Sequence, residues 1–438
     1  MSARTLFLQW IGIGLVGIGV LWEALLAPSV IGWGFIVIGF LALLLVERRR
    51  PTRTPLDWPL LLLALTGGCS LLVTALPEVT LVQVMRLGAG LAGFYGLVNW
   101  ARNRARLSYA AAALAAGGVG LALLAPVVVD WHRAKAVLIP SSFYRFPLLV
   151  SDPVHPNIMA ALMVLLFPLP LAQFLSPTGS ASGAQRIVRR LALGGACLVM
   201  GVVLLLTKSR GGYVAGAVGG LLVVWCSWRK RWALVLTLGV IALGTLLFVA
   251  MGSRSPELVE GAVDPSTWAF RQQVWRTALQ MLADFPFTGV GMGTFNDVAT
   301  VLYAFQETHS LGAHSLYLQV GVDLGLPGLI ACLAALLLTL WMAATATRTL
   351  GRRRDGELRA MALGALAGVV ALMIHGLVDH VAWNTRAAFV PWVVIGLVTA
   401  LYRWVTVEDT CRRPFAPGDG TPSGSHTACV SDPSVEER

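Results

Sequence analysis

The sequence predicts an all-α polytopic membrane protein with about 12 transmembrane helices and a large helical external (periplasmic) loop. Hydrophobic residues make up 56% of the 438 positions and charged residues only 13%. A soluble domain of this length could not bury that much apolar surface. Many apolar runs approach or exceed the roughly 20 residues that a helix needs to cross a bilayer.

Apolar runs give the expected spans in order, each uncertain by several residues at its ends. The first run is long and lacks a small-residue cleavage site, so it is expected to be a retained span. The spans are predicted at residues 6–26, 30–46, 58–76, 80–100, 107–129, 157–175, 190–206, 212–228, 232–252, 315–345, 360–378 and 388–404.

Basic residues orient these spans. Most of the 33 lysines and arginines lie in one set of connections, such as ERRRPTR at 47–53 and RTLGRRRDGELR at 348–359, and in the two tails. Because cytoplasmic loops are enriched in basic residues, this set and both termini are predicted to be cytoplasmic, in a multi-pass protein of the bacterial inner membrane. The net charge of +11 then reflects topology and contact with membrane lipids, and no nucleic-acid partner is expected.

Residues 1–404 are predicted to form a single transmembrane domain. The Pro-, Gly- and Ser-rich residues 405–438 are expected to be a disordered cytoplasmic tail. External basic residues gather at about 130–156, in the hairpin TKSRGGY at 207–213, and in the predicted external loop at about 253–314. A basic external cavity suits an anionic ligand better than a neutral one.

The external loop contains an amphipathic helix that stops before Pro286. Helical periodicity places Arg271 in the middle of its apolar arc and Arg276 on the polar face. A guanidinium on an apolar surface is costly unless it meets an anion, so Arg271 is expected to contact an anionic ligand. A buried ion pair and snorkelling are the alternatives, and Arg276 is expected to be solvated. The predicted arc consists of Val274, Trp275, Ala278, Met281, Leu282 and Phe285.

Glycines at 289, 291 and 293 follow this helix and predict a tight turn or a close backbone approach. The stretch is not a phosphate loop, because it has no preceding strand and no GK[ST] sequence.

His314 precedes an apolar run that would be ~46 Å long as one helix, too long for a bilayer core of about 30 Å. A break is therefore predicted at GLPG, 325–328, which leaves His314 at the N-terminal tip of a short helix over 315–324. The helix dipole favours a neutral imidazole there, and that imidazole can accept a proton. A polar interface residue is the alternative. Asp323 could be its partner only if the fold brings the two together.

Four motifs together resemble the O-antigen ligase and polymerase superfamily. The first is His314-Ser315, nine residues, Gly325, two residues, Gly328. The second is Ser209-Arg210-Gly211 at an outer hairpin. The third is Arg271, three residues, Trp275, followed by PFTGVGMGTF at 286–295. The fourth is His155-Pro156-Asn157 and Ala160 at the entry of a span.

This resemblance implies a glycosyltransferase that needs neither metal nor cofactor. Its donor would be a glycan on undecaprenyl diphosphate, and its acceptor the lipid A core or a second lipid-linked glycan. Arg210 and Arg271 would bind the diphosphate, and His314 would be the catalytic base. The further substrate-binding candidates are Lys208, Arg145, Asn157, Ser209 and Ser315.

Two alternatives remain open from the sequence. A polymerase that joins lipid-linked repeat units would use the same donor as a ligase, and no motif distinguishes the two. A transporter or lipid flippase would also fit twelve spans with both termini inside. Such proteins show repeated halves and charged or broken helices near the midplane. The sequence has no internal repeat, and Arg86 is its only clear charge deep in a span.

Overall fold

A computed structural model describes residues 3–25, 29–47, 52–131, 148, 153–176, 183–227, 231, 234–235, 239, 268–305, 312–380 and 383–412. Over these residues the chain is nearly all-helical and contains no β-strand, which confirms the expected all-α class. One isolated β-bridge joins Val129 to Val154.

Among the residues that the structure describes, eight stretches of helix are long and apolar enough to cross a membrane. Seven of them lie in the single helices α1 (Ala3–Leu25), α4 (Pro77–Trp100), α5 (Arg104–Val128), α8 (Gly183–Leu206), α13 (Leu316–Arg352), α14 (Gly356–His375) and α15 (Phe389–Arg412). The eighth, Pro156–Leu175, combines α6 (Pro156–Leu166) and α7 (Pro168–Leu175).

The other expected spans are shorter, less apolar or outside the described residues. α2 (Val30–Glu47) and α3 (Asp57–Val73) contain shorter apolar stretches. α9 (Arg210–Ser227) covers the span expected at 212–228, but its glycines and Arg210 make it less apolar than the eight. The span expected at 232–252 falls almost wholly outside the described residues. α15 ends at Arg412, beyond residue 405, where the tail was expected to begin.

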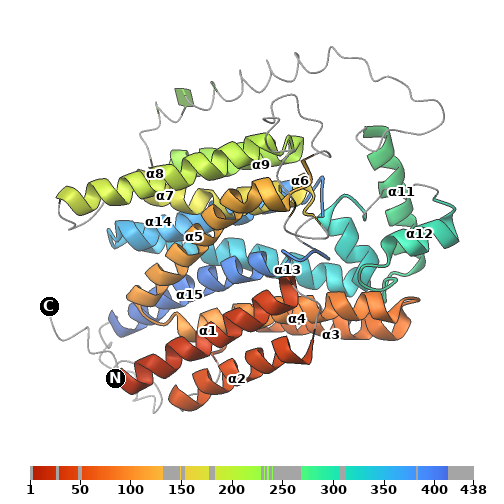
Figure 1. Cartoon of the computed structure of the whole chain (residues 1–438), viewed down its shortest axis with the longest axis horizontal. Coiled ribbons are helices and arrows are strands. Elements are labelled where there is room, and N and C mark those ends of the chain that lie inside the picture. The colour runs from red at the N-terminus through yellow and green to blue at the C-terminus, as the bar shows by residue number, and fades with distance from the viewer. Residues whose placement is uncertain are drawn as a thin grey trace, which may run out of the picture.

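The helices form a bundle with α13, α14 and α15 in its middle (Figure 1). α13 packs against α3, α14 and α15, while α14 packs against α6, α7 and α9. α15 lies against α4, which also contacts α1. α11 (Trp268–Asp284) and α12 (Phe295–Tyr303) lie at one end of the bundle, whereas α1 begins and α15 ends at the other.

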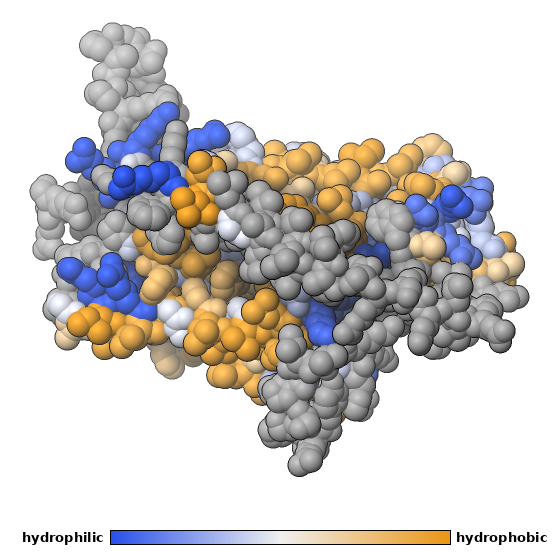
Figure 2. Space-filling view, turned by 90° about the horizontal axis from the view of Figure 1, so that it is seen from above, coloured by the Kyte–Doolittle hydropathy of each residue, from blue (hydrophilic) through white to orange (hydrophobic). Residues whose placement is uncertain are grey.

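The outer helices expose large apolar side chains, as lipid-facing helices do. On α8, Leu191 is 71% exposed and Leu198 is 67% exposed. Figure 2 shows hydrophobic residues over the middle of one face and hydrophilic residues toward its two ends. A soluble protein rarely exposes so large an apolar surface, and the band therefore fits a membrane-embedded bundle.

The predicted break in α13 is confirmed at Gly325, whose φ of 70° and ψ of −174° are not helical. The break frees the Leu326 amide, which donates to the Pro286 carbonyl over 2.7 Å. The predicted glycine turn is confirmed as well: Gly289, Gly291 and Gly293 all have positive φ. A Cβ atom at residue 289 would lie 2.5 Å from the backbone of Asp323, so only glycine allows this approach.

Candidate functional site

α11 presents Arg271 and Trp275 to the interior, as its periodicity predicts. Val274, Ala278 and Met281 are fully buried on its inner face, and Arg276 is exposed on the outer face. Arg271 Nη1 donates to the Val378 carbonyl over 2.6 Å. One turn further along, Trp275 Nε1 donates to the His314 carbonyl over 3.4 Å. The Arg-x3-Trp spacing thus places one helix turn of α11 against both His314 and Val378.

His314 is held in a left-handed backbone conformation immediately before α13, with a φ of 45°. On its N-terminal side, the Ala313 amide donates to Gln319 Oε1 over 2.7 Å. On its C-terminal side, the Leu316 amide donates to the Gly376 carbonyl over 2.7 Å. These two bonds fix the backbone around the imidazole against the start of α13 and the end of α14.

The turn at 375–380, with sequence HGLVDH, is where the predicted site residues meet. The span expected at 360–378 was too long: α14 ends at His375, and residues 376–378 turn away from the helix. No residue of this turn had a role predicted from the sequence. Four predicted residues nevertheless contact it through their side chains. These contacts are Asn157 Nδ2 to Asp379 Oδ2 (2.6 Å), Ser209 Oγ to His375 Nε2 (3.4 Å), Arg271 Nη1 to the Val378 carbonyl (2.6 Å) and Ser315 Oγ to the Gly376 carbonyl (3.4 Å).

His314, Asp379 and His380 form a compact cluster. One donor or acceptor atom of each lies within 4.8 Å of the others, and the two imidazole ring centroids are 6.0 Å apart. The His380 amide donates to Asp379 Oδ1 over 2.9 Å. Within the described part of the chain, this cluster is the one set of His, Cys, Asp and Glu side chains spaced to hold a metal ion. It can equally act as a proton acceptor with a neighbouring carboxylate.

Burial and charge set the protonation of this cluster. Burial lowers the pKa of His314 to about 4, and Asp379 opposes that shift. Burial alone would raise the pKa of Asp379, but the neighbouring His380, His375, His314 and Arg271 lower it overall. At neutral pH the site therefore combines a neutral imidazole with an ionised carboxylate. His314 Nδ1 is buried and has no hydrogen-bond partner within the described segments.

The SRG hairpin touches the same turn through its backbone. Ser209 is buried, and its hydroxyl accepts from the Gly212 amide over 3.2 Å, which caps the start of α9. A Cβ atom at residue 211 would lie 2.6 Å from Val378 Cγ2, so glycine is required for this approach. Arg210 itself is exposed and makes no hydrogen bond or ion pair to the residues that the structure describes. Lys208 lies directly before Ser209 in this hairpin, has a φ of 51° and is half-buried.

The His-Pro-Asn motif positions Asn157. His155 caps α6, with its Nδ1 accepting from the Asn157 amide over 3.1 Å, and Pro156 occupies the first helical position. Proline is well suited to that position because its missing N–H would be unpaired there anyway. Ala160, one turn on, lies under α9: a Cβ atom at residue 212 would be 3.0 Å from its own.

The remaining predicted residues have different outcomes in the structure. Arg145 lies outside the described residues. Ser209 and Ser315 use their hydroxyl groups in contacts within the protein, and their substrate roles stay predictions. Asp323 does not belong to the cluster of His314. It accepts hydrogen bonds from Gln319, Trp383 and Asn384 instead.

His375, Asp379 and His380 were not predicted from the sequence. Their only signal is the presence of three ionisable residues at the end of an apolar span, where such residues are rare and commonly functional. Their distant neighbours are Ser209 for His375, Asn157 for Asp379 and His314 for His380.

A family model described as O-antigen ligase matches residues 195–333, which supports the O-antigen ligase superfamily and confirms the resemblance over this part of the chain. The match includes Ser209, Arg210, Arg271 and His314, and it ends before the 375–380 turn. No curated protein matches the chain.

Proposed function

We propose, from the O-antigen ligase segment at 195–333, that this membrane protein is a glycosyltransferase of the ligase type. It moves a glycan from undecaprenyl diphosphate to an acceptor sugar of the lipid A core, on the outer side of the inner membrane. The observation that carries the proposal is that Arg271 and His314 lie at one turn: Arg271 donates to the Val378 carbonyl, and His314 lies beside the Asp379 carboxylate. A cation suited to a diphosphate and a neutral base thus lie side by side.

Arg271 and Arg210 are assigned to the diphosphate. As the glycan leaves, negative charge grows on the lipid diphosphate, and fixed guanidinium groups stabilise that charge without a metal ion. One N–H of Arg271 is used by the Val378 carbonyl, which orients the planar group. Its remaining N–H groups are then available for phosphate oxygens in a forked arrangement.

His314 is assigned as the base. It takes the proton of an acceptor hydroxyl while that oxygen attacks the anomeric carbon, and the bond from that carbon to the phosphate oxygen breaks. The diphosphate leaves with the electron pair, and the sugar inverts. An imidazole with a pKa of about 4 is neutral but a weak base. A bound anionic donor would raise that pKa, because nearby negative charge favours the protonated form.

Reconstitution tests the proposal and distinguishes a ligase from a polymerase and from a flippase. Purified protein is mixed with a lipid-linked glycan and either lipid A core or a second lipid-linked glycan as acceptor. Glycan on the core supports the ligase, whereas elongation of the lipid-linked chain identifies a polymerase. Failure of transfer with both acceptors would remove the proposal. Movement of labelled lipid across proteoliposomes without transfer would then identify a flippase.

A further inference from the structure

Asp323 lies at the centre of a buried hydrogen-bond network beside the candidate site. It is fully buried, and four N–H groups reach its carboxylate. These donors are Gln319 Nε2 (2.9 Å), Trp383 Nε1 (2.8 Å), Asn384 Nδ2 (2.5 Å) and the Gly293 amide (3.4 Å). A buried carboxylate is costly unless it is paired in this way, and the reaction proposed above gives Asp323 no direct part.

The orientation of the Gln319 side-chain amide depends on Asp323. An ionised carboxylate only accepts hydrogen bonds, so it pairs with the Nε2 end of Gln319. The opposite end, Oε1, then accepts from the Ala313 amide over 2.7 Å. If the side-chain amide were reversed, its oxygen would face the carboxylate and its N–H would face the Ala313 N–H, and both bonds would be lost. Gln319 is only 2% exposed, so water has little access to replace them.

The backbone that enters His314 lies directly against this amide. A Cβ atom at residue 312 would be 2.4 Å from Gln319 Oε1 and 2.6 Å from His380 Nε2, so only glycine fits there. His314 itself has a φ of 45°, which non-glycine residues seldom adopt and which persists only where the surroundings hold it. Displacement of the Gln319 amide would therefore release the backbone that orients the imidazole.

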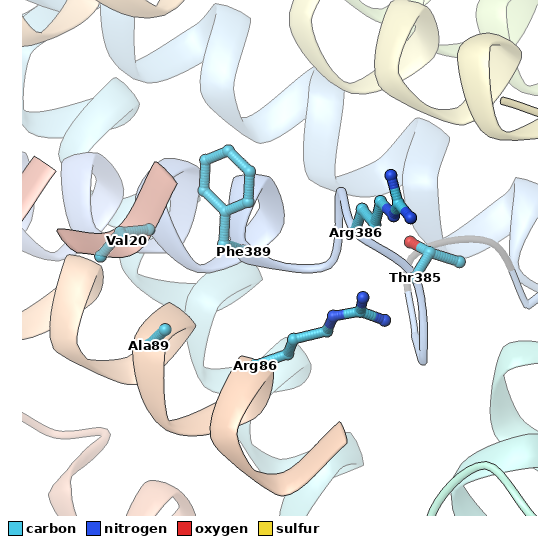
Figure 3. A pocket seen from close by; sticks show the side chains of 6 residues that line it. All are labelled: Val20, Arg86, Ala89, Thr385, Arg386 and Phe389. Carbon is cyan, nitrogen blue, oxygen red and sulfur yellow. The ribbon is translucent and has the colours of Figure 1, made fainter. Parts of the chain in front are cut away.

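Two of the donors to Asp323 belong to the segment that leads into α15. Trp383 is only 3% exposed, and Asn384 follows it. In Figure 3 the next two residues, Thr385 and Arg386, line a small pocket together with Arg86 of α4. The segment is therefore packed against α4, and its two donors hold the carboxylate in a fixed place.

We propose that Gln319 and Asp323 are positioning residues for His314 in the transfer reaction, a role that rests on the proposed function. Asp323 sets the direction of the Gln319 amide, and Gln319 Oε1 holds the residue before His314. The donor diphosphate is assigned to other residues, Arg210 and Arg271. Loss of the Gln319–Asp323 pair should therefore lower kcat and leave the KM for the donor near that of the wild type.

Two variants remove the pair in different ways. Gln319→Leu deletes both ends of the amide, and the isosteric Asp323→Asn introduces a donor that can turn Gln319 around. We expect each to lower kcat about tenfold with the donor KM nearly unchanged. In a His314→Ala background, adding Gln319→Leu should cause no further loss, because no imidazole remains to be positioned.

Asn384→Gly is the matched control. It removes one donor to Asp323, suits the positive φ of 55° at this position and leaves the Gln319 bond in place. Its kcat should stay near that of the wild type.

Acylation of His314 by diethyl pyrocarbonate reports the position of the imidazole without any transfer. It is measured by peptide mass spectrometry on the purified full-length protein. We expect His314 to react about fivefold faster in Gln319→Leu and Asp323→Asn than in the wild type, and at the wild-type rate in Asn384→Gly. The unfolding temperature shows which variants are folded, and if one of the pair does not fold, the other carries the test.

The two proposals can fail separately. Absence of transfer by the wild type with both acceptors would remove the proposed function, and the labelling of His314 would still decide whether Gln319 and Asp323 hold it. Unchanged labelling in the folded variants would overturn the positioning role. A further loss of transfer when Gln319→Leu is added to His314→Ala would overturn it too, since that loss would not act through the imidazole. Equally fast labelling in Asn384→Gly would show a general loosening of the fold and would also overturn it.

Discussion

Asn157 donates a 2.6 Å hydrogen bond to the Asp379 carboxylate and so joins two residues 222 positions apart. Asp379 is only 4% exposed. A buried carboxylate needs hydrogen bonds and nearby positive charge to remain ionised. Asn157 supplies the first and Arg271 helps to supply the second. The pair therefore ties the entry of α6 to the turn that carries the candidate base cluster.

Loss of this amide should weaken the site without removing its base. Hydrogen bonds to charged groups contribute about 1.5–3 kcal/mol, so Asn157→Leu should lower transfer roughly tenfold or more. Gln280→Leu, on the exposed face of α11, serves as the matched control. Transfer is measured per folded molecule. Equal rates for the two variants would show that Asn157 does not position the cluster.

Charge alone should not replace the guanidinium groups of the proposed diphosphate site. We expect Arg271→Lys and Arg210→Lys to lose most donor binding or turnover, because an ammonium group cannot make the bidentate contact. Arg276→Lys should be nearly silent, since Arg276 is exposed on α11. Donor binding and transfer are measured for all three. An equal loss at all three positions would show that the orientation of α11 does not select the functional arginine.

Removal of the imidazole should affect turnover more than donor binding. General bases contribute about 10²–10⁴-fold, so His314→Ala should reduce transfer by that order while the arginines still hold the donor. If His314 were a structural residue only, the folded yield would fall and the rate per folded molecule would stay near that of the wild type. Quantifying folded protein alongside transfer separates the two outcomes.

The pH dependence of transfer should reflect the buried imidazole. The active base is neutral and burial lowers the pKa of His314 to about 4. The acid limb of kcat/KM, which reports the free enzyme, should therefore lie near pH 4 and not near about 6.5. Asp379→Asn removes a charge that raises this pKa, so the limb should move to still lower pH.

The free energy of unfolding should also fall as the pH is lowered. The unfolded histidine has a pKa of about 6.5, so the unfolded chain binds a proton at His314 more readily than the folded protein does. The contribution of His314 is fully present above about pH 6.5 and is lost as the pH falls toward about 4. The comparison is the pH dependence of unfolding of the wild type and of His314→Ala over this range.

For the pH dependence of transfer, an acid limb of kcat/KM near pH 6.5 would mean that His314 is exposed or is not the base.

A methyl group at Gly211 of the SRG hairpin should displace the turn at 375–380, against which this glycine packs. Gly211→Ala would bring its Cβ atom to 2.6 Å from Val378 Cγ2, whereas Gly220→Ala on the same helix meets Leu171 Cδ2 only at 3.9 Å. The first variant should lose transfer because it displaces the turn that holds Arg271 and Asp379. The second should behave like the wild type. Similar activity of the two variants would show that this approach is not needed for function.

Sequence periodicity and backbone chemistry predicted the local parts of this structure. Three features follow from residues within a few positions of one another. They are the position of Arg271 on the inner face of α11, the break at Gly325 and the glycine turn at 289–293. Such features depend on helix geometry and on allowed φ values, which a sequence displays directly.

The base cluster could not be predicted in this way. Asp379 contacts Asn157 and His314 because three separate segments pack together. No spacing in the sequence encodes that meeting. Leu377 and Val378 are apolar and extend the hydrophobic run past His375, where α14 ends. The span was therefore expected to continue to residue 378, and no turn was predicted there. Asp323 was a possible partner of His314 only if the fold brought the two together, and it accepts hydrogen bonds from Trp383 and Asn384 instead.

The position of the 375–380 turn near the end of the chain sets an order of events during synthesis. A nascent chain emerges from its N-terminus, so Asn157, Arg271 and His314 are made before Asp379 exists. In the finished fold, Asn157 and Arg271 hydrogen-bond to this turn and His314 lies beside its carboxylate. A ribosome-bound intermediate that stops at residue 333 would hold the whole matched family segment and still lack the carboxylate. The carboxylate of the proposed site thus arrives only with α14 and the turn that follows it.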